Sequence, residues 1–390
     1  MASGHRQRRP RRGRHAGRDR PAWHARRRRG SAARHRARGR GRHRFQRGPG
    51  HGEDFAYPGR DRPWAGARRR RLRTRADPAG GRGPVPLNVV VLAGGTGGAA
   101  LAAGIQAVAP EHELTVIANT ADDDEFWGLL VCPDVDAVIY RLAGVFNEKA
   151  GYGVKDDTFH VLDSMARIGE EVWFRIGDKD IASHLVREGL LARGCTLTEA
   201  TRELCRRFEL RARVLPMTDG AVRTRFATDA GELSFQEYFV RERLQPALRG
   251  VTFAGLEAAS ATTDVLEALR EADRVVIGPS NPLISIAPIL ALVRRELARE
   301  RTVAVSPIVA GRALKGPTVE MMRALGPDPN PVEVARLYRD VASAFVLDAR
   351  DRELSGEIEE LGYRVIVCDT IMGDGGRTLA AAVLGAPPQK

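Results

Sequence analysis

The stretch VVVLAGGTGGAALAAGI, residues 89–105, predicts a buried strand, a glycine-rich turn and a helix. A Walker-type phosphate loop needs a lysine directly after its glycines, and neither lysine nor arginine follows here. Gly95, Gly97 and Ala100 match the dinucleotide fingerprint Gly-x-Gly-x-x-Gly/Ala in form. A single match of this kind is a weak signal. The stretch alone indicates only that backbone amides at a helix N-terminus offer a site for an anion, typically phosphate.

Downstream of Leu87, short apolar runs alternate with amphipathic segments. The runs are continuously apolar, which is typical of parallel strands covered on both faces. We expect strands over 87–94, 114–120, 172–178, 274–280, 302–307, 344–349 and 364–369. We expect helices over 98–108, 181–193, 263–272, 286–299 and 331–341. The fold class predicted is α/β, a Rossmann-like doubly wound, mostly parallel sheet that binds ligands at the carboxyl ends of its strands.

Residues 140–272 interrupt this alternation. They contain helical segments over 158–168, 181–193 and 198–207, and then an alternating stretch over 222–240 that predicts a β-hairpin turning at Asp229, Ala230 and Gly231. We interpret 140–272 as a helical and hairpin cap inserted into one Rossmann-like domain that spans residues 85–390.

The basic character of the chain lies in its first 84 residues. These hold 28 arginines, no lysine and five acids, a net charge of +23, whereas the remainder holds 34 basic and 44 acidic residues, a net charge of −10. We therefore expect no nucleic-acid binding by the body. Residues 1–84 are poor in aliphatic side chains and are expected to be disordered. An arm that binds nucleic acid or an anionic membrane is one interpretation. We prefer a mis-assigned start, with the working protein beginning near 84–87.

Two further features bound the class of protein. No apolar run reaches the roughly 18 residues that a membrane span needs, so we expect a cytoplasmic protein without membrane contact. The four cysteines are scattered, with no C-x-x-C pair, and predict neither a zinc site nor a disulfide framework.

Acidic side chains follow the second predicted strand. Asp122, Asp123 and Asp124 stand in a row, and Asp134 and Asp136 follow two residues apart. A single aspartate at such a place more often caps a helix or faces solvent. Five acids in so short a stretch after a glycine loop instead favour Mg²⁺, which bridges carboxylates to substrate phosphates.

Other polar residues follow neighbouring strands. Arg175 precedes a predicted helix, and Ser280 and Asn281 lie in a Gly-Pro-Ser-Asn-Pro loop suited to a phosphate or a base edge. His184 is more often structural in such a position. A dinucleotide site expects an acid that closes the second strand to hold a ribose, but Asn119 and Thr120 stand there. The set therefore favours phosphoryl-group transfer over hydride transfer.

Taken together, these segments resemble the 2-phospho-L-lactate transferase family of coenzyme F-420 biosynthesis, from about residue 88 to the last helix. The resemblance is carried by AGGTGG (93–98), NTADD (119–123), CPDVDAVIYRLAG (132–144), GYGVKDDTFHVL (151–162), FRIGDKDIASHLVR (174–187), VLPMTD (214–219), FQEYFV (235–240), IGPSNPLISIAPIL (277–290) and AVSPIVAGRALKGP (304–317). It implies a Mg²⁺-dependent transferase and a homodimer. In this reaction the ribityl hydroxyl of a deazaflavin, 7,8-didemethyl-8-hydroxy-5-deazariboflavin, attacks the phosphorus that carries a lactyl or enolpyruvyl group in a guanosine diphospho-linked donor, and GMP leaves.

The resemblance also implies roles for single residues. Asp136 and Arg175 match family positions that contact the deazaflavin, and Asp122 and Asp123 are expected to bind the metal or orient the attacking hydroxyl. The donor nucleotide is expected at Gly95, Thr96, Gly97, Ser280 and Asn281.

Three residues depart from the family pattern. Ala121 stands where the family usually has glycine, Ala137 where it has threonine, and Ala100 where a basic residue is common. Two alternatives remain: a gluconeogenesis-factor-like protein that binds nucleotide sugars without transferase chemistry, and an NAD(P)-dependent oxidoreductase. The first typically carries Asp-Asp-Gly-Gly-Ser-Ser-Gly after the second strand, whereas this chain has ADDDEFWG over 121–128.

Overall fold

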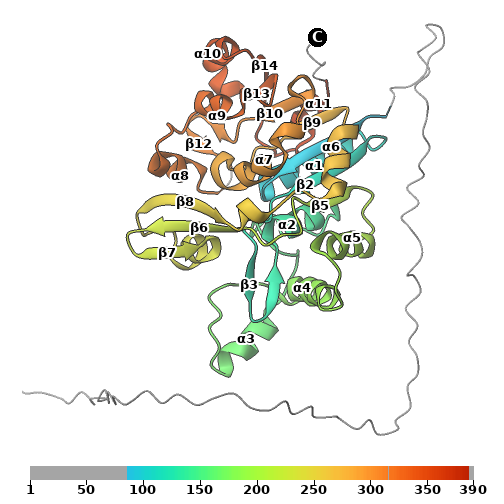
Figure 1. Ribbon diagram of the computed structural model, residues 1–390, viewed down its shortest axis with the longest axis vertical. Coiled ribbons are helices and arrows are strands. Elements are labelled where there is room, and N and C mark those ends of the chain that lie inside the picture. Colours follow the sequence, from blue (N-terminus) through green and yellow to red (C-terminus); the bar gives the residue numbers. More distant parts are fainter. Residues whose placement is uncertain (1–85, 315, 386–390) are drawn as a thin grey trace, which may run out of the picture. The chain divides into compact units, whose positions relative to one another are not determined.

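A seven-stranded parallel sheet forms the centre of the computed structural model, which describes residues 86–314 and 316–385 (Figure 1). The expectations for residues 1–84 lie outside the described residues. Across the sheet, the strands follow the order β14 (Arg364–Cys368), β13 (Ala344–Asp348), β10 (Thr302–Val305), β9 (Arg274–Ile277), β1 (Asn88–Ala93), β2 (Glu113–Ala118) and β5 (Arg213–Pro216). Every neighbouring pair is parallel. The predicted α/β, Rossmann-like class is confirmed.

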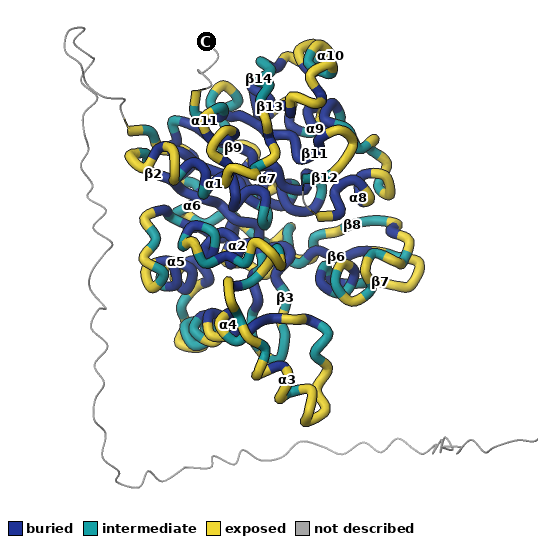
Figure 2. The backbone as a smooth tube through the Cα atoms, turned by 180° about the vertical axis from the view of Figure 1, so that it is seen from behind, coloured by how far each residue is buried: buried dark blue, intermediate teal, exposed yellow. Residues whose placement is uncertain are grey.

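Helices cover both faces of this sheet, and the central strand shows why its sequence is apolar throughout. Val89 and Val91 point into one hydrophobic core, and Val90 and Leu92 point into the other. The first core is closed by α1 (Thr96–Val108), α2 (Pro133–Leu142), α5 (Leu197–Arg207) and α11 (Arg377–Gly385). The second is closed by α6 (Thr263–Glu271), α7 (Ala287–Val293), α9 (Pro331–Tyr338) and α10 (Ser355–Glu360). Figure 2 shows the resulting buried centre in dark blue.

Smaller elements extend from the carboxyl ends of the strands. One group comprises the hairpin of β3 (Asp124–Phe126) and β4 (Leu129–Val131), with α3 (His160–Arg167) and α4 (Asp178–Leu191). A second is the antiparallel sheet of β7 (Gly231–Ser234), β6 (Arg223–Thr228) and β8 (Leu248–Ala254). The hairpin of β11 (Ile308–Val309) and β12 (Arg312–Ala313) and the helix α8 (Thr318–Leu325) follow β10. Figure 1 shows β3, α3 and α4 on one side of the main sheet, far from α10.

Two expected elements differ from the structure. Residues 172–178 form no strand, because Trp173 and Phe174 pack with Phe126 in a side cluster instead of joining the sheet. The seventh strand is β5, which is only four residues long and ends in Pro216. Proline cannot donate to a sheet ladder and is tolerated at an edge, which is where β5 lies. The predicted hairpin over 222–240 is present as β6 and β7.

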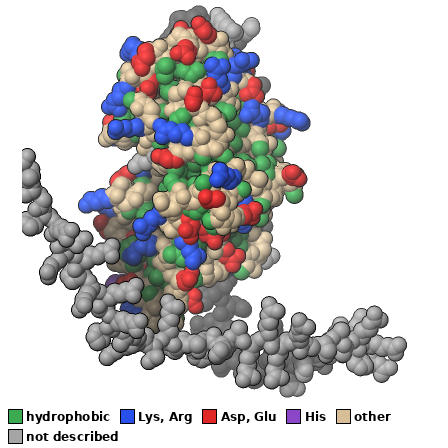
Figure 3. All heavy atoms as spheres, turned by 90° about the vertical axis from the view of Figure 1, so that its left-hand side faces the viewer, with side chains coloured by type: hydrophobic (Ala, Val, Ile, Leu, Met, Phe, Trp, Pro, Cys, Tyr) green, Lys and Arg blue, Asp and Glu red, His purple; other side chains and the backbone are tan. Residues whose placement is uncertain are grey.

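The structure shows where the charged side chains lie and whether the cysteines are paired. Lys and Arg side chains lie among Asp and Glu on the face shown in Figure 3. All four cysteines are free, and Cys132 and Cys205 are buried. Within residues 86–314 and 316–385, no helix combines the length and apolarity that crossing a membrane requires.

The glycines of the first loop give a test of this packing. An added Cβ on Gly97 would lie 2.4 Å from the carbonyl oxygen of Pro279, so we expect Gly97→Ala to lower the free energy of unfolding by about 1–3 kcal/mol. Gly356→Ala is the matched control, because its Cβ would meet nothing within 4 Å in α10; it should raise that free energy by about 0.5–1 kcal/mol. Urea denaturation measures both. Equal stability of the two variants would contradict the packing described.

Candidate active site

The site lies where the order of the sheet reverses. The chain adds β2 and β5 on one side of β1, then returns to place β9 on its other side and continues outward to β14. The loops after β1 and β9 therefore start side by side at the carboxyl edge of the sheet and lead to helices on opposite faces, α1 and α7. Such a switch point is where open α/β sheets bind their ligands.

The two loops at this point touch backbone to backbone. A Cβ on Gly97 would lie 2.4 Å from the Pro279 carbonyl oxygen, and one on Gly278 would lie 3.0 Å from the Gly98 Cα. The amide of Gly94 also donates to Ser280 Oγ at 3.1 Å. Gly95 has φ 70 and precedes α1. The first bond within the helix runs from the Ala99 amide to the Gly95 carbonyl, so the three preceding amides, from residues 96–98, have no partner within the helix.

The side chains predicted on the second loop are engaged locally. Asn281 accepts from the Leu283 amide at 3.0 Å and caps the π-helical turn Pro282–Ile286, and its Nδ2 lies 3.5 Å from Met321 Sδ. Ser280 holds Gly94 as described. These side chains shape the loops, and the unpaired amides of the first loop remain the groups best suited to an anion.

Two buried carboxylates lie beside the glycine loop. Asn119, directly after β2, donates from Nδ2 to Asp122 Oδ2 at 3.1 Å and to Asp134 Oδ2 at 3.0 Å. The Thr224 hydroxyl donates to Asp122 Oδ1 at 2.7 Å. A Cβ on Gly95 would lie 2.8 Å from Asp134 Oδ1, so this carboxylate lies directly against the loop. Asn119 therefore bridges two acids, where a dinucleotide site would have an acid for the ribose.

Burial makes this pair of acids unusual. It raises the pKa of Asp134 to about 7 and that of Asp122 well above its usual range, and the charge of Asp134 raises the pKa of Asp122 further. Such a pair retains a proton near neutral pH or exchanges it for a cation. Among the described residues, no three His, Cys, Asp or Glu side chains converge as metal ligands. Asp122 and Asp134 are two carboxylates that could hold a divalent cation, which takes oxygen ligands.

Asp123 belongs to a different group of contacts. Burial raises its pKa to about 8, and a hydrogen bond with the Cys132 thiol and the charges of Arg223 and Arg187 counteract part of that rise. Its Oδ1 is buried and has no hydrogen-bond partner. The structure thus places Asp123 with Cys132, Arg187 and Arg223, and places Asp122 with Asp134.

Asp123 also lines a cavity of about 310 Å³. The cavity lies beside the turn between α4 and α5 and the loop after β5, and its polar lining includes the half-buried Arg223. Its lining residues are Asp123, Leu130, Leu191, Cys195, Thr196, Leu197, Asp219, Gly220, Ala221 and Arg223. The loop after β2 therefore presents one acid beside the glycine loop and the next one to this cavity.

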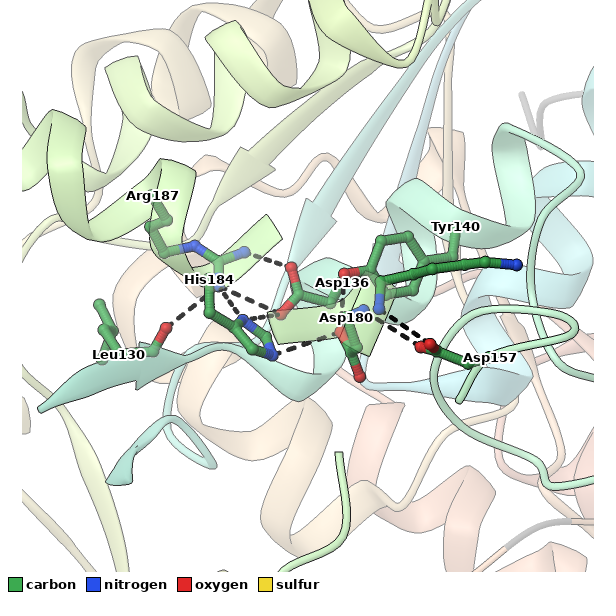
Figure 4. A network of polar contacts seen from close by, with 8 residues as sticks. Leu130, Asp136, Tyr140, Asp157, Asp180, His184 and Arg187 are labelled. Atoms are coloured by element: carbon green, nitrogen blue, oxygen red, sulfur yellow. Dashed lines mark hydrogen bonds and ion pairs between the residues drawn. The ribbon is translucent and has the colours of Figure 1, made fainter. Parts of the chain in front are cut away.

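Asp136 lies in the first turn of α2 and is bound by Arg187 of α4 (Figure 4). Both terminal nitrogens of Arg187 donate to its carboxylate, and Nη1 also donates to the Leu130 carbonyl at 3.2 Å. Asp136 is 4% exposed and Arg187 is fully buried. This ion pair joins α2 to α4 and to the β3–β4 hairpin.

Two further side chains of α4, His184 and Asp180, continue the chain of contacts from Arg187. His184 Nδ1 lies 3.1 Å from Arg187 Nη1, and its Nε2 lies 3.3 Å from Asp180 Oδ1. Arginine can only donate, so Nδ1 accepts and the ring proton is assigned to Nε2, which faces Asp180. The Tyr140 hydroxyl donates to the same Asp180 oxygen at 2.7 Å. His184 is therefore part of a buried polar network.

Arg175 is exposed, and its guanidinium carbon lies 4.4 Å from the ring centre of Phe159. The predicted residues thus fall into three groups. Asp122 lies beside the glycine loop, and Asp123 lines the cavity near Arg223. Asp136 and Arg175 lie near α4. Sequence reasoning missed the roles of Asn119, Arg187 and Thr224. Only Asn119 gave a signal, as a polar residue that directly follows a buried strand.

A Rossmann-like sheet with a glycine loop and buried acids at its switch point defines an α/β enzyme for phosphate-bearing substrates. The family model described as 2-phospho-L-lactate transferase CofD matches residues 89–378. The chain belongs to the 2-phospho-L-lactate transferase family and is a transferase.

Individual relatives agree with this assignment. The 2-phospho-L-lactate transferase of Methanosarcina mazei is 37% identical over 286 residues, which cover 73% of this chain and 94% of that protein. The phosphoenolpyruvate transferase of Streptomyces griseus is 38% identical over 306 residues, which cover 76% and 96%. A solved UPF0052 family protein from Bacillus halodurans is 16% identical with a TM-score of 0.46 over 73% of this chain and 89% of that one; the fold assignment rests on the strand order above.

The raised pKa values predict an unusual dependence of stability on pH. A carboxyl whose folded pKa exceeds its unfolded value holds a proton in the folded state that the unfolded chain has released. Stability in the presence of a chelator should therefore fall as pH rises from about 4 through the folded pKa values of about 7 for Asp134 and about 8 for Asp123.

Each such group contributes a slope of up to about 1.4 kcal/mol per pH unit. Asp134→Asn should remove one of these slopes, as measured by urea denaturation at several pH values. A wild-type stability that rises over the same range, or an unchanged slope in the variant, would contradict the assignment.

Proposed function

We propose that this chain transfers a phospholactyl or phosphoenolpyruvyl group from a guanosine diphospho-linked donor to the ribityl hydroxyl of 7,8-didemethyl-8-hydroxy-5-deazariboflavin. The hydroxyl oxygen forms a bond to the phosphorus that carries the three-carbon acid. The bond from that phosphorus to the bridging oxygen breaks, GMP leaves, and the hydroxyl proton is released. Mg²⁺ as cofactor, a homodimer and a cytoplasmic location belong to the same proposal.

One observation carries the proposal: the unpaired amides at the start of α1 lie beside the buried pair Asp122 and Asp134. A Cβ added to Gly95 would lie only 2.8 Å from Asp134 Oδ1, so the loop and this carboxylate are in close contact. Amides at a helix N-terminus favour phosphate, whereas buried carboxylates repel it unless a cation lies between them. A diphosphate with Mg²⁺ satisfies both groups at once.

The residues of this chain would act by position and charge. The amides of residues 96–98 would hold the diphosphate, and Asp122 and Asp134 would hold Mg²⁺ in a fixed place. Bound Mg²⁺ supplies neutralisation of the charge that builds up on the phosphate oxygens. Positioning and electrostatic stabilisation are the main protein contributions to phosphoryl transfer.

The acceptor is proposed to lie on the α4 side, at Asp136 and Arg175. The matched relatives support a transferase over a nucleotide-sugar-binding regulator, since their family is named for the transfer reaction. They are named both for phospholactate and for phosphoenolpyruvate, so both donors enter the test.

The direct test incubates the protein with the deazaflavin, each guanosine-linked donor and Mg²⁺, and follows GMP release together with the phosphorylated deazaflavin by mass spectrometry. We expect stoichiometric formation of both products with at least one donor. Absence of product with both donors would refute the transferase assignment.

The metal assignment has a test that needs no turnover. Mg²⁺ should raise the melting temperature of the wild type at pH 8, because it replaces the proton of the Asp122–Asp134 pair. Asp122→Asn should abolish this shift and lower the rate at least 100-fold. Asp264→Asn, which removes the half-buried partner of the exposed Arg202, should retain both. An equal Mg²⁺ shift in Asp122→Asn would place the metal elsewhere.

A further inference from the structure

The two residues assigned to the acceptor lie on different elements. Asp136 is in the first turn of α2, and Arg175 lies in the segment that leads into α4. Neither residue contacts the other directly in any described interaction. A continuous path of contacts nevertheless joins them, and it runs along α4.

The first half of the path is the buried network of Figure 4. It leads from Asp136 to Arg187, from there to His184, and on to Asp180. Arg187, His184 and Asp180 are each at most 5% exposed, and all three lie on α4. α4 is thus attached to α2 by polar contacts from which water is excluded.

The second half of the path consists of hydrogen bonds between residues 157–161, at the start of α3, and the first turn of α4. Asp157 accepts from the Lys179 amide at 2.8 Å and from the Asp180 amide at 3.1 Å, so it caps α4. Asp178 reaches back and accepts from the Thr158 hydroxyl at 2.6 Å and from the amides of residues 160 and 161 at 3.0 Å. Phe159 lies between these fastened residues, and Arg175 stacks on its ring.

Stability alone gives little reason for such a network. Replacing a buried ion pair with apolar side chains is often neutral or stabilising, so burial of the pair is weak evidence that it is there for stability. The network does hold α2 at a fixed distance and orientation relative to the residues around Phe159. A displacement of about 1 Å at a reacting group can cost about 100-fold in rate.

We propose that this path sets the separation of Asp136 and Arg175 and so determines how the acceptor fits. Arg187 and Asp157 are positioning residues: Arg187 acts through Asp136, and Asp157 acts through the Phe159–Arg175 stack. The inference rests on the proposed function for its substrate, whereas the mechanical coupling along α4 does not depend on any substrate.

Gly177 offers a precise way to disturb the path. It has φ −83, which alanine also adopts, but an added Cβ would lie 2.2 Å from Asp157 Cγ. Gly177→Ala must therefore push Asp157 away from the start of α4. Gly189→Ala, in the same helix, is the matched control, because its Cβ would meet only Arg193 Nη1 at an ordinary 3.5 Å.

The kinetic experiment compares both variants with the wild type. Gly177→Ala should raise the KM for the deazaflavin about tenfold and leave the KM for the nucleotide donor unchanged, whereas Gly189→Ala should change neither. A purely structural role would instead lower the melting temperature without separating the two KM values. An unchanged acceptor KM in folded Gly177→Ala would overturn the proposal.

Hydrogen exchange tests the path without substrate. Arg187→Lys keeps the positive charge beside Asp136 but loses the bidentate hydrogen bonding of the guanidinium to the carboxylate. We expect faster exchange of the amides of Lys179 and Asp180, which Asp157 caps at the far end of the path, and unchanged exchange there in Gly189→Ala. Unchanged exchange in Arg187→Lys would overturn the coupling. If the wild type does not use deazaflavin as acceptor, the proposed function is wrong. The exchange result would still show whether contacts along α4 couple Arg187 to Asp157.

Discussion

The loops after β1 and β9 approach each other so closely that no side chain fits at Gly94 or Gly97. A Cβ on Gly94 would lie 2.1 Å from Ser285 Cβ, and one on Gly97 would lie 2.4 Å from the Pro279 carbonyl. This packing holds the N-terminus of α1 at the carboxyl edge of the sheet, where its first amides lack helical partners. It also brings Gly95 against Asp134. The position of the first amides of α1 beside the acid pair therefore depends on this close contact between the two loops.

The first turn of α2 connects the two sides of the site. Two residues of a helix that are two positions apart point in directions about 160° apart, so Asp134 faces the glycine loop while Asp136 faces Arg187. A movement of α2 would shift both carboxylates together. The proposed donor side, through Asp134, and the proposed acceptor side, through Asp136, thus share one helix. This arrangement suits a reaction that must hold two substrates in line.

Much of the fold could be predicted because its signals are local. Continuous apolar runs marked six of the seven sheet strands, and the glycine loop marked the start of α1. The short edge strand β5 and the absence of a strand over 172–178 could not be predicted in this way. Whether a segment joins a sheet depends on the strand it pairs with as well as on its own composition. The site shows the same division. Asp122, Asp123 and Asp136 were predicted from their types and spacing, but their surroundings were not. Asp123 faces a different environment from Asp122, and Arg187 reaches Asp136 from 51 positions away. Such pairings arise only when the chain folds.

The most direct test of this account is a crystal structure of the protein with GDP and Mg²⁺. We predict both phosphates against the amides of residues 96–98, between the loops after β1 and β9, with Mg²⁺ bound by Asp122 and Asp134. Phosphates bound in the cavity beside Arg223, or a metal bound by Asp123 without Asp134, would contradict the central claim.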